Sequence, residues 1–128
     1  MEDSTYINEL EYIKKLYDEI IAAFPEYRVY TEKKYDSLRP DISIENENFN
    51  IIIEVKNARN YSSLPFSTLM QLEDYKNIPN SNVILISLSE VNKLMEDKLK
   101  EMDIKTFIKP NFKSIIKYLK EETSHNSR

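Results

Sequence analysis

Residues 39–56 of this 128-residue chain read RPDISIENENFNIIIEVK, and this stretch decides the fold. Two isoleucine-rich segments, residues 41–44 and 51–55, flank the polar connection ENENFN. β-Branched residues favour strands, and asparagine-rich connections favour turns. The stretch therefore predicts a β-hairpin, and its second strand is apolar enough to lie near the centre of a sheet.

The alternation of side chains along these two strands predicts a polar cluster. Successive side chains of a strand point to opposite faces. Glu54 and Lys56 therefore share one face of the second strand, while the β-branched residues around them occupy the other. Asp41 alternates with the isoleucines of the first strand in the same way. If ENENFN closes a hairpin, Asp41 and Glu54 come together near one end, with the ammonium group of Lys56 beside them.

The rest of the chain predicts helices on both sides of this hairpin. A first helix is followed by three consecutive strands, and after them helices alternate with strands. This order indicates an α/β fold with a mixed sheet flanked by helices. We expect a single domain over residues 1–122 and a disordered tail over residues 123–128. The predicted helices are residues 5–24, 65–77, 89–102 (opened by a capping box at Ser89) and 111–120, and the remaining strands are residues 27–31, 83–88 and 104–108.

The composition excludes several classes of site. The chain has no cysteine, which excludes disulfides, zinc–thiolate sites and iron–sulfur clusters and favours a reducing, cytoplasmic compartment. It has no glycine either, which excludes glycine-rich phosphate loops and leaves the turns to Asn, Pro, Ser and Asp. No apolar run approaches the length of a membrane span, and the acidic N-terminus does not resemble a signal peptide.

The net charge of −4 argues against binding to nucleic acid. Nucleic-acid-binding proteins usually present a basic field. The acidic residues here crowd into residues 1–26, whereas basic residues recur around the predicted hairpin. These basic residues are Arg28, Lys33, Lys34, Arg39, Lys56, Arg59 and Lys76.

Two carboxylates and one ammonium group suit phosphodiester hydrolysis. Mg²⁺ prefers oxygen ligands and retains several waters. Asp41 and Glu54 supply two such ligands, and the backbone carbonyl of Val55 supplies a third. A cation there would polarise the phosphate and lower the pKa of water. Lys56 would orient the attacking water or stabilise the charge that develops on the phosphate.

The series RPDISI and NIIIEVK resembles the PD-(D/E)xK nuclease superfamily. The matched positions are Pro40, Asp41, Glu54, Val55 and Lys56. The resemblance implies a restriction-endonuclease-like fold and a metal-dependent DNA endonuclease that uses Mg²⁺ or Mn²⁺. The short length is similar to that of archaeal Holliday-junction resolvases and of the nuclease domains of restriction subunits.

The resemblance extends to two helices. The family commonly adds an acidic residue on its first helix, and Glu9 fits this catalytic, metal-binding role best because it borders the apolar face; Glu2 and Glu19 remain alternatives. Many members carry a glutamine and a tyrosine, spaced QxxxY, after the lysine strand. Gln71 and Tyr75 match this pattern as supporting residues, although both could simply pack against the sheet.

The partners follow from the same interpretation. We expect Arg39, Arg59 and Lys76 to contact DNA, although solvated loop charges are the commoner case. A chain this small covers little DNA, so we expect a homodimer with its interface on the final helix or on the helix near Met70. Two alternatives stay open: a degenerate, non-catalytic nuclease fold that binds nucleic acid or a protein partner, and an interaction domain whose motif is coincidental.

Overall fold

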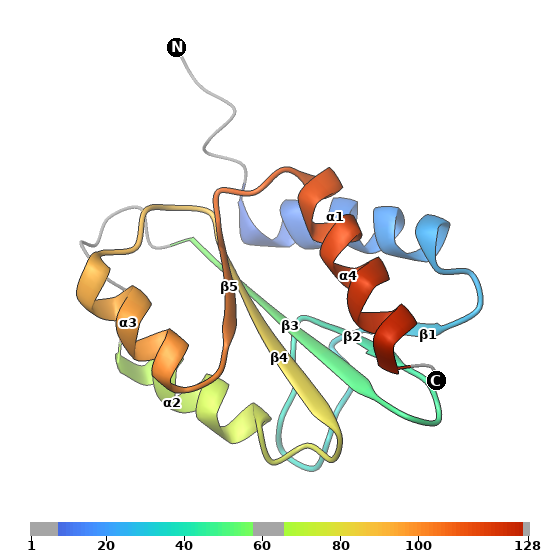
Figure 1. The fold of residues 1–128 in the computed structure, drawn as a ribbon, viewed down its shortest axis with the longest axis horizontal. Coiled ribbons are helices and arrows are strands. Elements are labelled where there is room, and N and C mark those ends of the chain that lie inside the picture. The colour runs from blue at the N-terminus through green and yellow to red at the C-terminus, as the bar shows by residue number, and fades with distance from the viewer. Residues whose placement is uncertain (1–7, 58–65, 127–128) are drawn as a thin grey trace.

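The computed structural model describes residues 8–57 and 66–126. Helices and strands follow one another in the predicted order, α-β-β-β-α-β-α-β-α. Figure 1 shows a central sheet with helices on both sides. The elements are α1 (Glu9–Ala23), β1 (Arg28–Thr31), β2 (Ile42–Glu45), β3 (Asn50–Lys56), α2 (Phe66–Tyr75), β4 (Ser81–Ser87), α3 (Lys93–Glu101), β5 (Lys105–Ile108) and α4 (Phe112–Asn126).

The five strands form one mixed sheet in the order β1-β2-β3-β4-β5. The first three strands are antiparallel neighbours, and β4 and β5 continue the sheet in parallel with β3. The connection of residues 46–49 closes β2 and β3 into the predicted hairpin. Its first residue, Asn46, accepts hydrogen bonds from the backbone N–H groups of Asn48 and Phe49 at 2.7 and 3.0 Å. The α/β fold and the mixed sheet are therefore confirmed.

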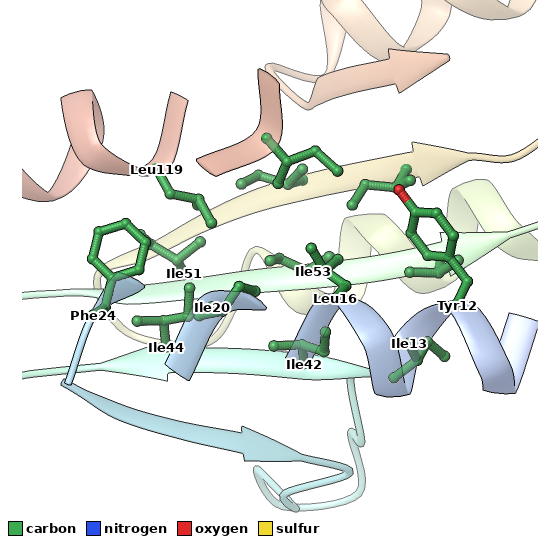
Figure 2. Packing of buried hydrophobic residues seen from close by; sticks show 14 of the residues in the cluster. Tyr12, Ile13, Leu16, Ile20, Phe24, Ile42, Ile44, Ile51, Ile53 and Leu119 are labelled. Carbon is green, nitrogen blue, oxygen red and sulfur yellow. The ribbon is translucent and has the colours of Figure 1, made fainter. Parts of the chain in front are cut away.

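One face of the sheet packs against α1 and α4, as Figure 2 shows. Alternate residues of β2 and β3 supply the sheet side of this layer, and they are fully buried because helices cover them. The α1 side comes from residues spaced three or four apart, which lie on one face of a helix. The central residues of this layer are Ile42, Ile44, Ile51, Ile53, Leu16, Ile20 and Leu119.

The opposite face packs against α2 and α3. Its core contains Ile52 of β3, Leu72 of α2, Leu85 of β4 and Leu99 of α3, all fully buried. Ile52 alternates with the isoleucines of the first layer, as the pattern predicted. Glu54, two residues along the strand, therefore lies on the face that α2 covers.

Three helix boundaries differ from the prediction by four residues or more. The first helix, α1, begins at Glu9, and its N-cap is Asn8. The predicted capping box at Ser89 is wrong, because α3 begins at Lys93 and its N-cap is Asn92, whose side chain accepts a hydrogen bond from the N–H of Met95 at 2.8 Å. The last helix, α4, continues past Lys120 to Asn126, so most of the predicted tail is helical. Residues 127–128 lie outside the described part of the chain.

Because the chain has no glycine, other residue types adopt the positive φ angles of its turns. Five non-glycine residues have positive φ angles in the described part of the chain, a conformation that asparagine and aspartate tolerate best. Three of them are of these types, including Asn80 directly before β4. The other two, Glu32 and Lys109, have φ angles of 59° and 50°. Within residues 8–57 and 66–126, no helix combines the length and the apolar character that a membrane crossing requires.

The central packing predicts a large effect of truncating Ile53. Its side chain is fully buried between the sheet and α1. We expect Ile53→Ala to lower the free energy of unfolding by about 3 kcal/mol, because it removes buried methyl groups and leaves a cavity. Ile21→Ala, at a residue that is 40% exposed on α1, is the matched control and should cost well below that. Urea denaturation measures both, and equal losses would contradict this packing.

Candidate active site

The register of the β2–β3 hairpin sets Asp41 opposite Glu54. Ile42 pairs with Ile53 across the two antiparallel strands. One residue further along, Asp41 and Glu54 therefore come next to each other. Directly opposite residues of an antiparallel pair point to the same face of the sheet. The two carboxyl groups thus lie together on the α2 face, at the end of the hairpin away from its turn.

Side chains replace the backbone hydrogen bonds where the β2–β3 ladder ends. Asp41 Oδ2 accepts a hydrogen bond from the N–H of Val55 at 2.8 Å, and the N–H of Asp41 donates to Glu54 Oε1 at 3.4 Å. The chain bends at Asp41, so the strand pairing ends there, and the preceding residue, Pro40, has no N–H. The N–H and C=O of one strand residue point to the same side. The Val55 carbonyl therefore points to the β2 side of β3, just beyond the end of the ladder.

Glu54 is a buried carboxylate that, besides the N–H of Asp41, has two side-chain partners of different kinds. The residue is only 4% exposed. Its Oε1 accepts a hydrogen bond from the hydroxyl of Tyr75 in α2 at 2.9 Å. Its Oε2 lies 3.6 Å from the ammonium nitrogen of Lys56, which is partly exposed. The predicted cluster of Asp41, Glu54, Lys56 and Tyr75 is therefore one contiguous group of side chains.

Both carboxyl groups hold protons more tightly than usual. Burial raises the pKa of Asp41 from 3.8 to about 6, although the Val55 N–H and the Lys56 charge oppose the shift. Burial, and then the charge of Asp41, raise the pKa of Glu54 from 4.5 to about 7. The hydroxyl of Tyr75 and the ammonium group of Lys56 act in the opposite direction on Glu54. Near neutral pH the pair therefore carries less than its full charge of −2.

Glu9 lies near this cluster, at the start of α1. Its Oε2 accepts a hydrogen bond from the backbone N–H of Asn57 at 2.6 Å, which ties the first turn of α1 to the end of β3. Among the described residues, no group of three or more His, Cys, Asp or Glu side chains is placed to hold a metal ion. Glu9 is nevertheless close enough for its charge to contribute to the raised pKa of Asp41.

The remaining predicted residues lie in different surroundings. Gln71 is half-buried one helical turn before Tyr75 and shares its side of α2. Arg39 is exposed, directly before Pro40. Lys76 donates hydrogen bonds to the carbonyls of Met102 and Asp103 at 2.7 and 3.2 Å, so it binds the C-terminal end of α3. Arg59 lies outside the described residues.

Glu32 is a neighbour of the site that the sequence interpretation missed. It follows β1 directly, and its N–H donates to the carbonyl of Asp41 at 3.3 Å. Its charge contributes to the raised pKa of Asp41. The residue has a positive φ angle, which is unfavourable for glutamate. The sequence carries no local signal for this placement, because it depends on the pairing of β1 with β2.

The comparisons with known proteins support the fold alone. No protein-family model and no curated protein matches the sequence. The fold is similar to that of protein VC1899 from Vibrio cholerae, with a TM-score of 0.63 over 86% of this chain at 13% identity. It is also similar to AF1548, a protein of unknown function, with a TM-score of 0.52 over 76% of this chain at 11% identity. The chain covers 32% of the first protein and 57% of the second, less than two thirds of either.

The raised pKa values predict that the metal-free protein loses stability as the pH rises. The unfolded carboxyl groups release their protons near pH 3.8 and 4.5, whereas the folded ones release them near 6 and 7. Between these limits the folded state binds more protons, so the free energy of unfolding falls with increasing pH. We expect a loss on the order of 5 kcal/mol between about pH 4 and about pH 7.5.

Urea denaturation in a chelator checks this slope. Glu54→Gln should flatten it, since the amide does not titrate. Glu47→Gln, in the exposed hairpin turn, is the matched control and should leave the slope unchanged. A slope that is identical in all three proteins would contradict the raised pKa of Glu54.

Removal of the Tyr75 hydroxyl should raise the pKa of Glu54 further. The hydroxyl donates to the charged carboxylate, which favours the charged form. Tyr75→Phe keeps the ring and removes this donor. Carbon-13 NMR titration of the glutamate carboxyl carbons measures the pKa. Tyr118→Phe, packed on the opposite face of the sheet, is the control, and a Glu54 pKa that stays constant in Tyr75→Phe would contradict the hydrogen bond.

Proposed function

We propose that this chain is a metal-dependent DNA endonuclease domain of the PD-(D/E)xK type, with a restriction-endonuclease-like fold. One observation carries the proposal: the half-buried Asp41, directly before β2, and the buried Glu54 of β3 are adjacent carboxyl groups, and the ammonium group of Lys56 lies 3.6 Å from Glu54. Burying two like charges side by side opposes folding. Such a pair is typical of a site that binds a cation.

The oxygen atoms of the cluster suit Mg²⁺ or Mn²⁺. Asp41 Oδ1 accepts no hydrogen bond from the described residues, and Glu54 Oε2 has only the longer contact with Lys56. The Val55 carbonyl points to the same side of β3 as the Val55 N–H, which binds Asp41. Two carboxylates and one carbonyl form the all-oxygen set that hard divalent cations prefer. Asp41, Glu54 and Val55 are therefore the residues that would hold the cation, and it would supply a Lewis acid for the phosphate and lower the pKa of water.

The chain's own residues supply orientation and charge. The Val55 N–H fixes the Asp41 carboxylate, and the Tyr75 hydroxyl fixes that of Glu54. Lys56 has an ammonium group with three donors, and its partly exposed position lets it contact solvent and the Glu54 carboxylate at once. It would orient the attacking water and stabilise the charge that develops on the phosphate.

The choice of DNA as substrate depends on the basic residues near the carboxylates. Arg28 and Lys33 lie near Glu45, with the Lys33 ammonium at 2.6 Å, so they are not available for phosphate in this structure. Arg39 and Lys34 are exposed and form no ion pair within residues 8–57 and 66–126. Arg39 immediately precedes Pro40 and Asp41. A phosphate that reaches the carboxylates therefore comes near the guanidinium group of Arg39, which binds phosphate well.

A non-catalytic domain is the second candidate. The net charge of −4 favours it, because a domain that binds DNA tightly usually presents a basic surface. Such a domain would bind nucleic acid or a protein partner through the same fold without cutting. Catalysis and cation binding separate the two candidates.

The enzyme proposal predicts cutting that requires both carboxylates and the lysine. The wild-type chain with Mn²⁺ or Mg²⁺ should nick supercoiled plasmid or cut branched duplexes, and a chelator should stop it. Asp41→Asn, Glu54→Gln and Lys56→Met should each lower the rate by about a hundredfold or more, because each removes a cation ligand or a charge that stabilises the phosphate. Agarose-gel assays measure the rates.

Two matched controls and a second readout complete this test. Glu47→Gln and Lys117→Met change exposed residues away from the site and should cut like the wild type. Mn²⁺ should also raise the melting temperature of the wild type, and more so above pH 7, where both carboxylates are charged. Stabilisation by Mn²⁺ without cutting of any plasmid, branched or single-stranded substrate would favour the non-catalytic candidate. Absence of both effects would refute the metal site.

A further inference from the structure

The outer surface of the α2–α3 layer contains an apolar groove that the nuclease proposal does not use. It is a hollow of about 240 Å³ between the two helices, lined by residues that include Phe66, Met70 and Met102. Phe66 is 73% exposed and Met70 is 57% exposed. They are four residues apart and so lie on the same side of α2. We call this hollow the α2–α3 groove.

Leu94 extends the apolar surface on the α3 side. It is 78% exposed, and it lies one helical turn before Lys98, which lines the α2–α3 groove. Exposed leucine, methionine and phenylalanine side chains are common singly, but several on one surface indicate a contact site. Water exclusion from this surface would therefore favour association.

The two helices run in the same direction. Each connects neighbouring parallel strands of the sheet, β3 to β4 and β4 to β5. The contact of Lys76 with the Met102 carbonyl joins their C-terminal ends, and Figure 1 shows the helices side by side. Phe66 and Leu94 therefore both lie at the N-terminal end of the layer.

Opposite charges lie further along the same helices. Glu73 and Asp74 on α2, and Lys98 on α3, all line the α2–α3 groove. None of the three forms an ion pair within the described part of the chain. Glu73 precedes Lys76 by three residues and Lys98 precedes Met102 by four, so the acids and the lysine lie at similar heights along the layer.

We infer that the α2–α3 groove binds a second copy of this chain, with α2 of each copy against α3 of the other. A two-fold axis along the helices produces this arrangement and makes every contact twice. It sets Phe66 opposite Leu94 of the other copy, and Lys98 opposite Glu73 and Asp74. Charges that are unpaired in one copy then become paired across the interface. The surface is complementary to itself, which selects a second copy as the partner.

Sedimentation velocity of the full chain tests this arrangement. The mass obtained for the wild type should be twice the 15.2 kDa of one chain. Met70→Glu and Leu94→Glu should each raise the dissociation constant by about tenfold or more, because each buries an unpaired charge. Leu10→Glu changes a leucine that is 70% exposed on α1, and this control should remain dimeric.

Charge exchange separates this interface from a general loss of folding. Lys98→Glu alone, and Glu73→Lys with Asp74→Lys, should each weaken the dimer by like-charge repulsion. The triple variant should restore it, since the pairing is reversed but intact. A monomeric wild type would overturn the inference and leave the groove to a different protein. A dimer that survives Met70→Glu and Leu94→Glu, or a triple variant that stays monomeric, would overturn it as well. These measurements need no nuclease activity, so their outcome is independent of the proposed function.

Discussion

The antiparallel register of β2 and β3 is the constraint on which the fold and the site both depend. The pairing of Ile42 with Ile53 sends one set of isoleucines to the α1–α4 layer and leaves Ile52 to the α2–α3 layer. The same pairing sets Asp41 opposite Glu54. A slip of one residue would turn the isoleucines of one strand toward the wrong layer. Hydrophobic burial therefore fixes the relative position of the two carboxyl groups.

Burial of the charged carboxyl groups of the site opposes folding, and the surrounding packing offsets this cost. Glu54 belongs to a strand whose neighbouring residues are fully buried, and its burial raises its pKa to about 7. An isolated buried carboxylate would be costly. The apolar side chains of β3 are packed on both faces, and their burial offsets this cost. Functional sites commonly carry such unfavourable interactions, which the surrounding structure stabilises.

The sequence predicted most reliably what depends on local patterns. The hairpin, the two faces of β3 and the cluster of Asp41, Glu54 and Lys56 follow from alternation and from a short turn. The start of α3 was mispredicted because Ser89 and Asn92 are both good N-caps, and only the buried packing around the helix selects one. The end of α4 was placed too early because its polar last turns offered no apolar pattern, although Thr123 is buried.

Long-range contacts account for what the sequence did not reveal. Glu9 and Asn57 are separated by 48 positions, so their hydrogen bond has no signature in either segment. Glu32 reaches Asp41 only because β1 pairs with β2, and its positive φ angle is atypical for glutamate. A helical wheel could place Glu9 at the border of the apolar face. It could not show that the Glu9 carboxylate accepts a hydrogen bond from the N–H of Asn57.

The register also gives a physical reason for each residue type in the Pro-Asp pair. Proline at position 40 offers no N–H donor just beyond the end of the strand pair. Aspartate at position 41 supplies, through its side chain, the acceptor for the N–H of Val55. The strand pair thus ends with its donor satisfied and its carbonyl available, beside two carboxylates. Backbone and side-chain oxygens of this kind therefore lie together at the end of the β2–β3 pairing.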